Sequence, residues 1–380
     1  MYLKNTLQLV RSRLANECES SVFLSPSEYQ KVGAELGPLV SGRLIVDPTI
    51  GDSGRGRSLA RALATGRDRA LERLLKAAHV DAVFEVGQFF GARFALPVIA
   101  WIPDLQHRYM PEMFTRINWW RRELAFRMQI RSGRTLMVSS ATARGDLERF
   151  YPSACGRTHV VRFAIDLDIA RYRDREPEVR AAYSISGRFF FLPNQFWRHK
   201  NHAIIVAALA RLKREGALEL MPPIMLSGSA QDIRNPTHFA DLMRDARAAG
   251  VESHFRYLGF IPYDHVLSLV SCCDALINPS RFEGWSTPIE EAKAVGAPLI
   301  LSDIPIHREQ APGASFFDPL SSEAAANALR EMGRCPHAPR ASLEVLSAEQ
   351  NLRLNDHAAS LLKTVQAAVH GARERATGEP

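Results

Sequence analysis

Residues 274–302 read DALINPSRFEGWSTPIEEAKAVGAPLILS, and their pattern decides the fold class. The apolar run 275–278 predicts a buried strand, and the run 299–301 predicts a second strand after an intervening helix. A strand, a helix and a second strand in this order form a parallel βαβ unit. In such a unit the loop at the carboxyl end of the first strand faces the ligand crevice, so we expect functional residues directly after residue 278.

The predicted helix in this stretch begins with a capping signature. Thr287 is a candidate N-cap, Pro288 suits the first helical position, and Glu290 completes a T-x-x-E capping box. The first turn of a helix offers unpaired N–H groups and a partial positive charge. The sequence therefore predicts a diphosphate site at this helix N-terminus.

Two carboxylates flank this N-terminus. Glu283 in the loop and Glu291 in the first helical turn are eight residues apart, and both can face one crevice. Carboxylates beside a phosphate site are unfavourable unless they accept hydrogen bonds, and sugar and ribose hydroxyls are suitable donors. Favourable interaction with the helix dipole is an alternative explanation for Glu290 and Glu291. It does not explain Glu283, or Gly284, which lets the backbone approach a ligand closely.

The alternation of short apolar runs with helical patterns continues through the chain and predicts an α/β protein with parallel sheets. A chain of 380 residues exceeds one ordinary core, so we expect two domains joined by the charged stretch around RYRDREPEVR. The predicted parts are an N-terminal domain at 1–165, a linker at 166–187, a C-terminal domain at 188–346, and a helix with a tail at 347–380.

Composition and charge exclude some classes of protein. The chain has no uncharged apolar run of about 18 residues, and its N-terminus lacks the apolar core of a secretory signal, so we expect a cytoplasmic protein. The five cysteines show no metal-ligand spacing, which favours reduced thiols. The net charge is +7, and residues 1–170 hold 24 Lys and Arg against 17 Asp and Glu. A basic first half can attract nucleic acid, an anionic membrane or a phosphate-bearing substrate.

The segment EGWSTPIEEA closely resembles the EGFGLPxLEA signature of glycosyltransferase family 4, whose members are retaining enzymes of GT-B fold. The resemblance covers the whole C-terminal half, because FLPNQFWRHKNH at 191–202, YLGFIP at 257–262 and SDIPIHREQAP at 302–312 match further segments of that family. In the first half, WIPDLQHRYMPEMF at 101–114 resembles a signature of members that build bacterial surface polysaccharides. The resemblance implies two Rossmann-like domains facing a cleft, with a last helix that crosses back to the N-domain.

The resemblance also implies roles for residues at the family's motif positions. Glu291 would hydrogen-bond the ribose, and Glu283 would contact the donor sugar and stabilise charge at the anomeric centre. Lys200, aided by Arg198, would neutralise the departing diphosphate, although a solvated basic loop is the alternative for both residues. Backbone N–H groups at the start of the helix would bind the diphosphate as well. The expected donor-binding set is Glu291, Lys200, Arg198, Gly284, Ser286 and Thr287.

Asp104 and His107 follow the predicted strand at 97–102, where the family often places a His or His-Asp near the donor sugar and acceptor. We predict both as catalytic residues beside Glu283, with a surface position as the alternative. Asp166 and Asp168 have the D-x-D spacing of metal-dependent transferases, but they lie at the start of the linker, so we interpret them as structural. We expect no metal and no cofactor, and a GDP- or UDP-linked donor sugar as substrate.

The chain departs from the family pattern at its start. MYLKNTLQL resembles the first helix of family members, so we expect an N-domain that lacks the first strand and the Gly-rich loop. An inactive nucleotide-sugar-binding or scaffold protein is therefore an alternative to an enzyme. A sugar-nucleotide epimerase of GT-B fold is disfavoured by the linear Glu-x7-Glu segment, and a nucleic-acid binder by the lack of a recognised binding motif.

The predicted function is a retaining hexosyltransferase, with mannose as one candidate sugar, in O-antigen, lipopolysaccharide or capsule-type polysaccharide synthesis. Its acceptor would be a glycan or a lipid-linked glycan. Residues 114–134 are basic and carry Trp119 and Trp120, a combination that suits docking on an anionic membrane. An ordinary exposed helix is the alternative. Peripheral attachment at the inner face of the cytoplasmic membrane is thus a further hypothesis.

Overall fold

The computed structural model describes residues 2–50, 52–85, 89–232, 234–334 and 340–377, and the chain forms two compact units. Unit 1 consists of Met1–Ala164 and Leu352–Pro380, and unit 2 consists of Ile165–Asn351. Each unit has its own parallel sheet and its own hydrophobic clusters.

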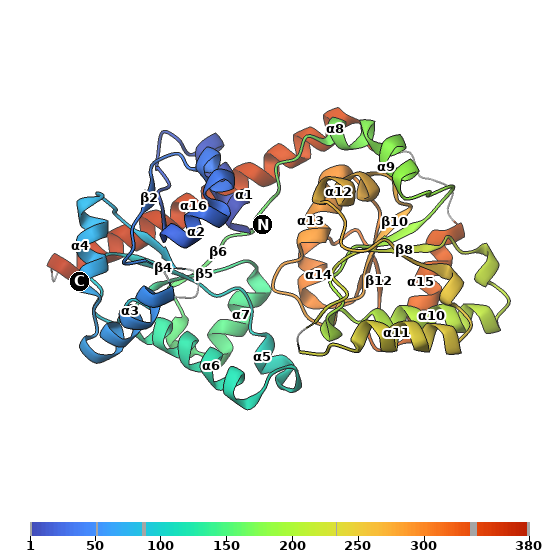
Figure 1. Ribbon diagram of the computed structural model, residues 1–380, viewed down its shortest axis with the longest axis horizontal. Helices are drawn as coiled ribbons and strands as arrows, with labels where there is room; N and C mark the ends of the chain where they lie inside the picture. Colours follow the sequence, from blue (N-terminus) through green and yellow to red (C-terminus); the bar gives the residue numbers. More distant parts are fainter. Residues whose placement is uncertain (1, 51, 86–88, 233, 335–339, 378–380) are drawn as a thin grey trace. The chain divides into compact units, whose positions relative to one another are not determined.

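Unit 2 contains a six-stranded parallel sheet with the order β12-β11-β10-β7-β8-β9 (Figure 1). The strands are β7 (Phe190–Leu192), β8 (Ile224–Leu226), β9 (Phe255–Tyr257), β10 (Ala275–Asn278), β11 (Leu299–Ser302) and β12 (Ser315–Phe317). Counted from the first strand of the unit, this is the order 3-2-1-4-5-6 of a Rossmann-like doubly wound sheet. The strand order reverses between β7 and β10, and ligands bind outside the carboxyl ends of strands at such a reversal.

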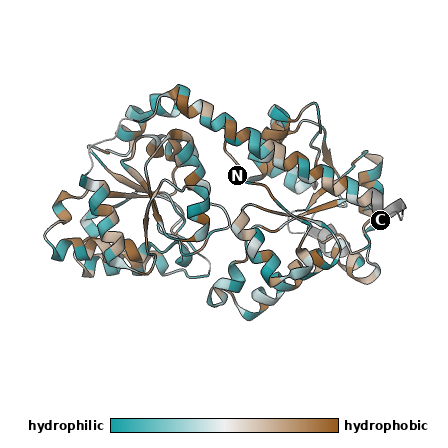
Figure 2. Ribbon diagram, turned by 180° about the vertical axis from the view of Figure 1, so that it is seen from behind, coloured by the Kyte–Doolittle hydropathy of each residue, from teal (hydrophilic) through white to brown (hydrophobic). Residues whose placement is uncertain are grey.

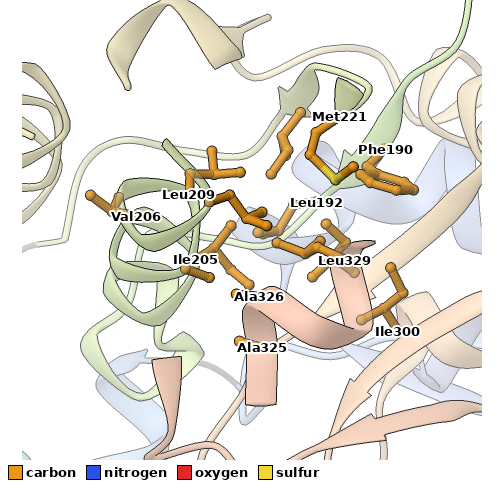
Figure 3. Close-up of a cluster of buried hydrophobic side chains, with 14 of the residues drawn as sticks. Phe190, Leu192, Ile205, Val206, Leu209, Met221, Ile300, Ala325, Ala326 and Leu329 are labelled. Carbon is orange, nitrogen blue, oxygen red and sulfur yellow. The ribbon is translucent and has the colours of Figure 1, made fainter. Parts of the chain in front are cut away.

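The alternation of side chains along β7 builds a core on each face of this sheet. Phe190 and Leu192 enter one cluster, which is drawn in Figure 3, and Phe189 and Phe191 enter the other. The first cluster is covered by α10 (His202–Arg214), α11 (His238–Ala248) and α15 (Ser322–Arg334). The second is covered by α12 (Tyr263–Cys272) and α13 (Thr287–Val295). The short helix α14 (Pro305–Gln310) follows β11.

The stretch predicted as a linker forms two helices of unit 2. These are α8 (Ile169–Asp174) and α9 (Glu176–Ala182), and their Ile169 and Val179 are buried in the second cluster. Asp168 is the N-cap of α8, and Asp166 accepts a hydrogen bond from Gln350 Nε2 at 3.3 Å. Both carboxylates thus hold elements of the fold.

Unit 1 contains a four-stranded parallel sheet with the order β3-β4-β5-β6 and a separate parallel pair, β1 and β2. The strands are β1 (Val22–Leu24), β2 (Leu44–Val46), β3 (Val83–Glu85), β4 (Val98–Trp101), β5 (Thr135–Val138) and β6 (Thr158–Val160). Its helices before α16 are α1 (Tyr2–Arg13), α2 (Pro26–Leu36), α3 (Asp52–Thr65), α4 (Arg69–Ala77), α5 (Gln106–Tyr109), α6 (Arg116–Arg131) and α7 (Ala141–Phe150). Short 3-10 helices occur in both units. Those of unit 1 are Gly37–Leu39, Pro111–Met113 and Pro152–Ala154, and those of unit 2 are Arg198–Lys200, Leu218–Leu220 and Glu252–His254.

The last helix, α16 (Leu343–Thr377), contributes to both units. Its Leu346 lies in the second cluster of unit 2, whereas Leu354, Leu361 and Ala368 lie in the cluster of unit 1 that also contains β4 and β5 side chains. The helix thus begins before residue 347, where the sequence predicts its start. One set of its buried residues packs in unit 2 and another set packs in unit 1.

Figure 2 shows hydrophobic colouring along the strands and hydrophilic colouring on much of the helix surface. This distribution matches sheets that are buried on both faces. Within the part of the chain that the structure describes, no helix has the length and the apolar character needed to cross a bilayer.

Candidate functional site

The candidate site of unit 2 is formed by the two loops that follow β7 and β10, on either side of the point where the strand order reverses. The loop after β7 carries Lys200, and the loop after β10 carries Glu283. The two loops are joined by a backbone hydrogen bond from Arg281 N to His199 O at 2.8 Å. Residues that lie 83 positions apart in the sequence therefore meet at one edge of the sheet.

Lys200 and Glu283 form an ion pair at the centre of this site. Lys200 Nζ lies 2.6 Å from Glu283 Oε1, and the side chains are only 11% and 10% exposed. Burial opposes ionisation of Glu283, but the Lys200 ammonium, with help from His307 and Ser280, outweighs it and lowers the pKa of Glu283 to about 2. Both groups are thus charged at neutral pH, and each compensates the other.

Three asparagines that sequence reasoning did not single out hold these loops in place. Asn194 Nδ2 donates to Asn278 Oδ1 at 3.1 Å, and Asn278 Nδ2 donates to Ser286 Oγ at 2.8 Å. Asn201 adopts a left-handed conformation, with φ of 57°, and donates to Pro279 O at 3.2 Å. Asn278 ends β10, Asn194 lies two residues after β7, and Asn201 directly precedes α10. Such positions at the ends of elements are the sequence signal that could have found them.

The start of α13 differs from the predicted capping box. Ser286 is the N-cap residue, Thr287 is the first helical residue, and no side chain caps the helix. The box is wrong because Glu290 is engaged elsewhere: it accepts from Lys293 Nζ at 2.9 Å and from Gln310 Nε2 at 2.9 Å. Its carboxylate is therefore held by side chains, and not by the backbone of the helix start.

Gln310, the last residue of α14, supplies the missing cap from another element. Its Oε1 accepts from Ser286 N at 3.0 Å, and its Nε2 donates to Ser286 O at 2.8 Å. The Ser286 N–H, which the sequence predicts as a diphosphate ligand, donates to Gln310 in this structure. Of the first-turn amides, those of Thr287 and Ile289 remain, since Pro288 has none.

Glu291 lies on α13 with its carboxylate buried. Tyr263, the first residue of α12, donates its hydroxyl to Glu291 Oε1 at 2.8 Å. Burial raises the pKa of Glu291 to about 7, and the Tyr263 hydrogen bond only partly opposes this. The Glu291 carboxylate is therefore under-supplied with hydrogen-bond donors and suits a ligand that brings hydroxyls.

The remaining predicted binding residues of unit 2 have simpler surroundings. Gly284 follows Glu283 in the loop and is half-buried. Arg198 is exposed, and the described residues offer it no ion-pair partner. Lys200 rather than Arg198 is thus the cation that the fold brings to Glu283.

The two residues predicted as catalytic in unit 1, Asp104 and His107, both have polar partners within their own unit. His107 is fully buried, with its Nε2 3.1 Å from Glu123 Oε2, and it packs against Phe114 and Phe126. Burial lowers the pKa of His107, so its ring is neutral. Asp104 accepts from Gln106 N at 2.8 Å and from Arg122 at 2.6 Å, which fixes the turn after β4. A position after a strand does not reveal which way a side chain turns.

His107 belongs to a polar network around Glu123 that sequence reasoning missed. The carboxylate of Glu123 forms an ion pair with Arg108. It also accepts hydrogen bonds from Arg127 Nε at 2.6 Å and from the Tyr151 hydroxyl at 2.6 Å. Burial opposes ionisation, but these partners outweigh it and lower the pKa of Glu123 to about 2. The network joins α5, α6 and Tyr151, the residue that follows α7, and stabilises unit 1.

Comparison with known sequences points to one class of enzyme. Residues 178–344 match the family model described as glycosyl transferases group 1. EpsF of Bacillus subtilis (strain 168), named as a glycosyltransferase, is 26% identical over 294 residues, which cover 73% of this chain and 68% of EpsF. MMP alpha-(1->4)-mannosyltransferase of Mycolicibacterium hassiacum is 25% identical over 234 residues, which cover 59% of this chain and 52% of that protein. The chain thus spans about half the length of this second relative.

Comparison with solved structures defines the fold. A glycosyltransferase from Rickettsia africae ESF-5 superposes with a TM-score of 0.67 at 11% identity, covering 98% of this chain and 94% of that chain. HepE of Anabaena, solved in complex with UDP and glucose, superposes with a TM-score of 0.57 at 14% identity, covering 98% of this chain and 95% of that chain. The predicted GT-B fold is confirmed, and the matches support the predicted glycosyltransferase class.

Proposed function

We propose that this chain transfers a hexosyl group from a nucleotide-sugar donor to a glycan or lipid-linked acceptor, with retention of the anomeric configuration. The observation that carries the proposal is the meeting of Lys200 and Glu283 at the strand-order reversal of unit 2, next to the N-terminus of α13. A cation and a helix N-terminus suit a diphosphate, and a buried carboxylate suits sugar hydroxyls. The family model that matches residues 178–344 spans this whole region.

Each polar group has a proposed part in the donor complex. Lys200 and the amides of Thr287 and Ile289 bind the diphosphate and stabilise the charge that develops as it leaves. Glu283 accepts hydrogen bonds from the donor sugar. Glu291 accepts hydrogen bonds from the ribose, whose hydroxyls supply the donors that this buried carboxylate lacks.

The proposed reaction is a front-face displacement. The bond from the anomeric carbon to the diphosphate oxygen breaks, and a bond to the acceptor oxygen forms on the same face of the sugar. The acceptor hydroxyl proton passes to the departing diphosphate oxygen. Because Lys200 and the α13 N-terminus supply positive charge at that oxygen, we propose that no metal ion is required, and activity in excess EDTA tests this point.

Relatives guide the choice of donor. HepE was solved with UDP and glucose, and one related sequence is a mannosyltransferase, so UDP-glucose and GDP-mannose are the first donors to try. The resemblance to proteins of bacterial surface-polysaccharide synthesis suggests an O-antigen, lipopolysaccharide or capsule glycan as acceptor.

Calorimetric titration with UDP and GDP tests the proposed donor site. We expect one of the two to bind the parent chain and to bind Glu291→Ala at least about tenfold more weakly, because the ribose loses its acceptor. Glu219→Ala, on the short helix Leu218–Leu220, is a matched control that removes a carboxylate elsewhere in unit 2. A folded parent chain that binds neither nucleotide would disprove the assignment of the site.

A protein that binds the donor without transferring the sugar is the second candidate function. It is favoured by the burial of His107, whose ring contacts Glu123, and by the hydrogen bond from Arg122 to Asp104. Release of nucleoside diphosphate from sugar nucleotides distinguishes the two candidates. Binding without release in the presence of acceptor extracts favours the binding protein.

We further propose that α6 docks on an anionic membrane surface, where lipid-linked acceptors reside. Ile117, Trp120 and Leu124 lie on one face of this helix and are 71%, 61% and 57% exposed. Three exposed arginines of the same helix have no ion-pair partner among the described residues: Arg116, Arg121 and Arg131. Exposed apolar side chains beside unpaired arginines suit an interface with anionic lipid headgroups.

Vesicle sedimentation tests this docking surface. We expect the parent chain to bind phosphatidylglycerol vesicles but not phosphatidylcholine vesicles, and we expect Trp120→Ser with Leu124→Ser to lose the binding. Leu220→Ser, which removes an apolar side chain that is 66% exposed in unit 2, is the matched control and should bind like the parent. Equal binding by the double variant and the parent would contradict the proposal.

A further inference from the structure

The Lys200–Glu283 ion pair raises a question about the proposed donor site, on which this inference rests. Lys200 is proposed to bind the diphosphate and Glu283 to bind the sugar, yet in the structure the two groups bind each other at 2.6 Å. Among the described residues, Glu283 is the one carboxylate that forms an ion pair with Lys200. The contact of Lys200 with the diphosphate and the contact of Glu283 with the sugar therefore compete with the ion pair between Lys200 and Glu283.

The competition is strong because the pair is shielded from water. Both side chains are about nine-tenths buried, so solvent and salt screen their attraction less than they screen a surface pair. A charge-assisted hydrogen bond of this length is also stronger than a neutral one. A diphosphate that takes Lys200 must replace this contact, and it leaves the Glu283 carboxylate without its cation.

The donor and the product differ in whether they compensate Glu283. A nucleotide sugar brings hydroxyls that can donate to the Glu283 carboxylate while its diphosphate takes Lys200. A nucleoside diphosphate keeps its negative charge but lacks the hydroxyls of the donor sugar, so Glu283 stays uncompensated and close to the diphosphate. Breaking the ion pair therefore weakens binding of the nucleoside diphosphate more than binding of the nucleotide sugar.

We propose that Glu283 acts as an internal competitor for Lys200, which favours the intact donor over the nucleoside diphosphate and promotes release of that product. While the sugar is present, Glu283 binds its hydroxyls. After the sugar has moved to the acceptor, Glu283 returns to Lys200 and displaces the diphosphate. Removal of the Glu283 charge should therefore tighten product binding while it weakens the preference for the sugar.

Calorimetry with UDP, GDP, UDP-glucose and GDP-mannose tests this exchange on the full chain. The variants are Glu283→Gln, Glu283→Ala and Lys200→Met, with circular dichroism and thermal unfolding to show that each is folded. Glu290→Gln is the matched control, because Glu290 is a buried carboxylate of the neighbouring helix that binds Lys293 and Gln310 and not Lys200. It reports the effect of losing one negative charge near the site without breaking the pair.

For the nucleoside diphosphate that the parent binds, we expect Glu283→Gln to tighten binding by about tenfold and Glu290→Gln to change it by less than about threefold. The ratio of product to donor dissociation constants should fall in Glu283→Gln, because the sugar loses its charged acceptor and keeps only a weaker amide acceptor. When Lys200 is replaced by Met, Glu283→Gln should tighten binding of the nucleoside diphosphate much less, since there is no cation for which Glu283 and the diphosphate compete.

Parent binding with no tightening in either folded Glu283 variant overturns the exchange alone. Failure of the folded parent to bind any of the four nucleotides overturns the proposed function together with the exchange.

Discussion

At the scale of the residue, two buried glutamates show how partners decide the chemistry of a carboxylate. Glu123 in unit 1 is surrounded by Arg108, Arg127 and Tyr151, which outweigh the cost of burial and lower its pKa to about 2. Among the residues that the structure describes, Glu291 in unit 2 has the Tyr263 hydroxyl as its one side-chain donor, and burial raises the pKa of Glu291 to about 7. The fold fully supplies the first carboxylate with donors and leaves the second able to accept more. Glu123 is therefore structural, and Glu291 is suited to a ligand.

The raised pKa of Glu291 predicts that nucleotide binding depends on pH. Ribose hydroxyls donate to the ionised carboxylate, so binding favours the deprotonated form and lowers the pKa in the complex. The dissociation constant should then be constant above about pH 7.5 and rise below pH 7, by up to about tenfold per pH unit, as the free protein takes up a proton. Titrations between pH 5.5 and 8.5 measure this slope.

The control for this prediction is Glu291→Gln, which cannot titrate. The terminal phosphate of a nucleoside diphosphate also ionises near pH 6, but it does so equally with both proteins. The parent should therefore show a steeper pH dependence than the variant. Parallel curves would show that Glu291 does not change its protonation state on binding.

At the scale of the element, the apolar runs at 275–278 and 299–301 predicted β10 and β11, because both strands are buried throughout and read as short apolar runs. The family motif pointed to Lys200 and Glu283, and the structure brings these two side chains together in the loops after β7 and β10. Their roles in donor binding stay predictions. The cap of α13 could not be predicted, because Gln310 lies 24 residues beyond Ser286 and no local pattern joins them. The contact of His107 with Glu123 could not be predicted for a related reason: Glu123 lies 16 residues away on another helix.

The observed cap gives a prediction about the stability of α13. Gln310→Leu leaves Ser286 N, Ser286 O and the Glu290 carboxylate without their buried partner, and we expect it to cost about 1–3 kcal/mol in the free energy of unfolding. Thr287→Ala should change it by less than about 0.5 kcal/mol, because Thr287 makes no capping hydrogen bond. Urea unfolding followed by circular dichroism measures both. A larger loss in Thr287→Ala than in Gln310→Leu would restore the capping box that the sequence predicts.

At the scale of the whole molecule, α16 is one continuous helix of 35 residues that stabilises two separate cores. Leu346 is buried among side chains of unit 2, whereas Leu361 is buried among side chains of α1 and the unit 1 sheet. The family resemblance predicted a last helix that returns to the N-domain, but the division of its buried residues between two cores depends on contacts with segments far away in the chain. Unit 1 is thereby completed by the C-terminal residues of the chain.

This arrangement predicts that two similar substitutions on one helix weaken different units. Leu361→Ala should destabilise unit 1 and Leu346→Ala should destabilise unit 2, each by about 2–5 kcal/mol, because each leaves a cavity in a close-packed cluster. Hydrogen exchange followed by mass spectrometry locates the effect, since faster exchange should spread through the peptides of β4 and β5 in the first variant and of β10 and β11 in the second. The variants are matched controls for each other, being the same substitution at buried positions of the same helix.

Nucleoside diphosphate binding separates them further: Leu361→Ala should keep the dissociation constant of the parent, because the proposed donor site lies in unit 2. If Leu361→Ala accelerates exchange equally in both sheets, the two units unfold together, and α16 transmits the loss of packing from one core to the other.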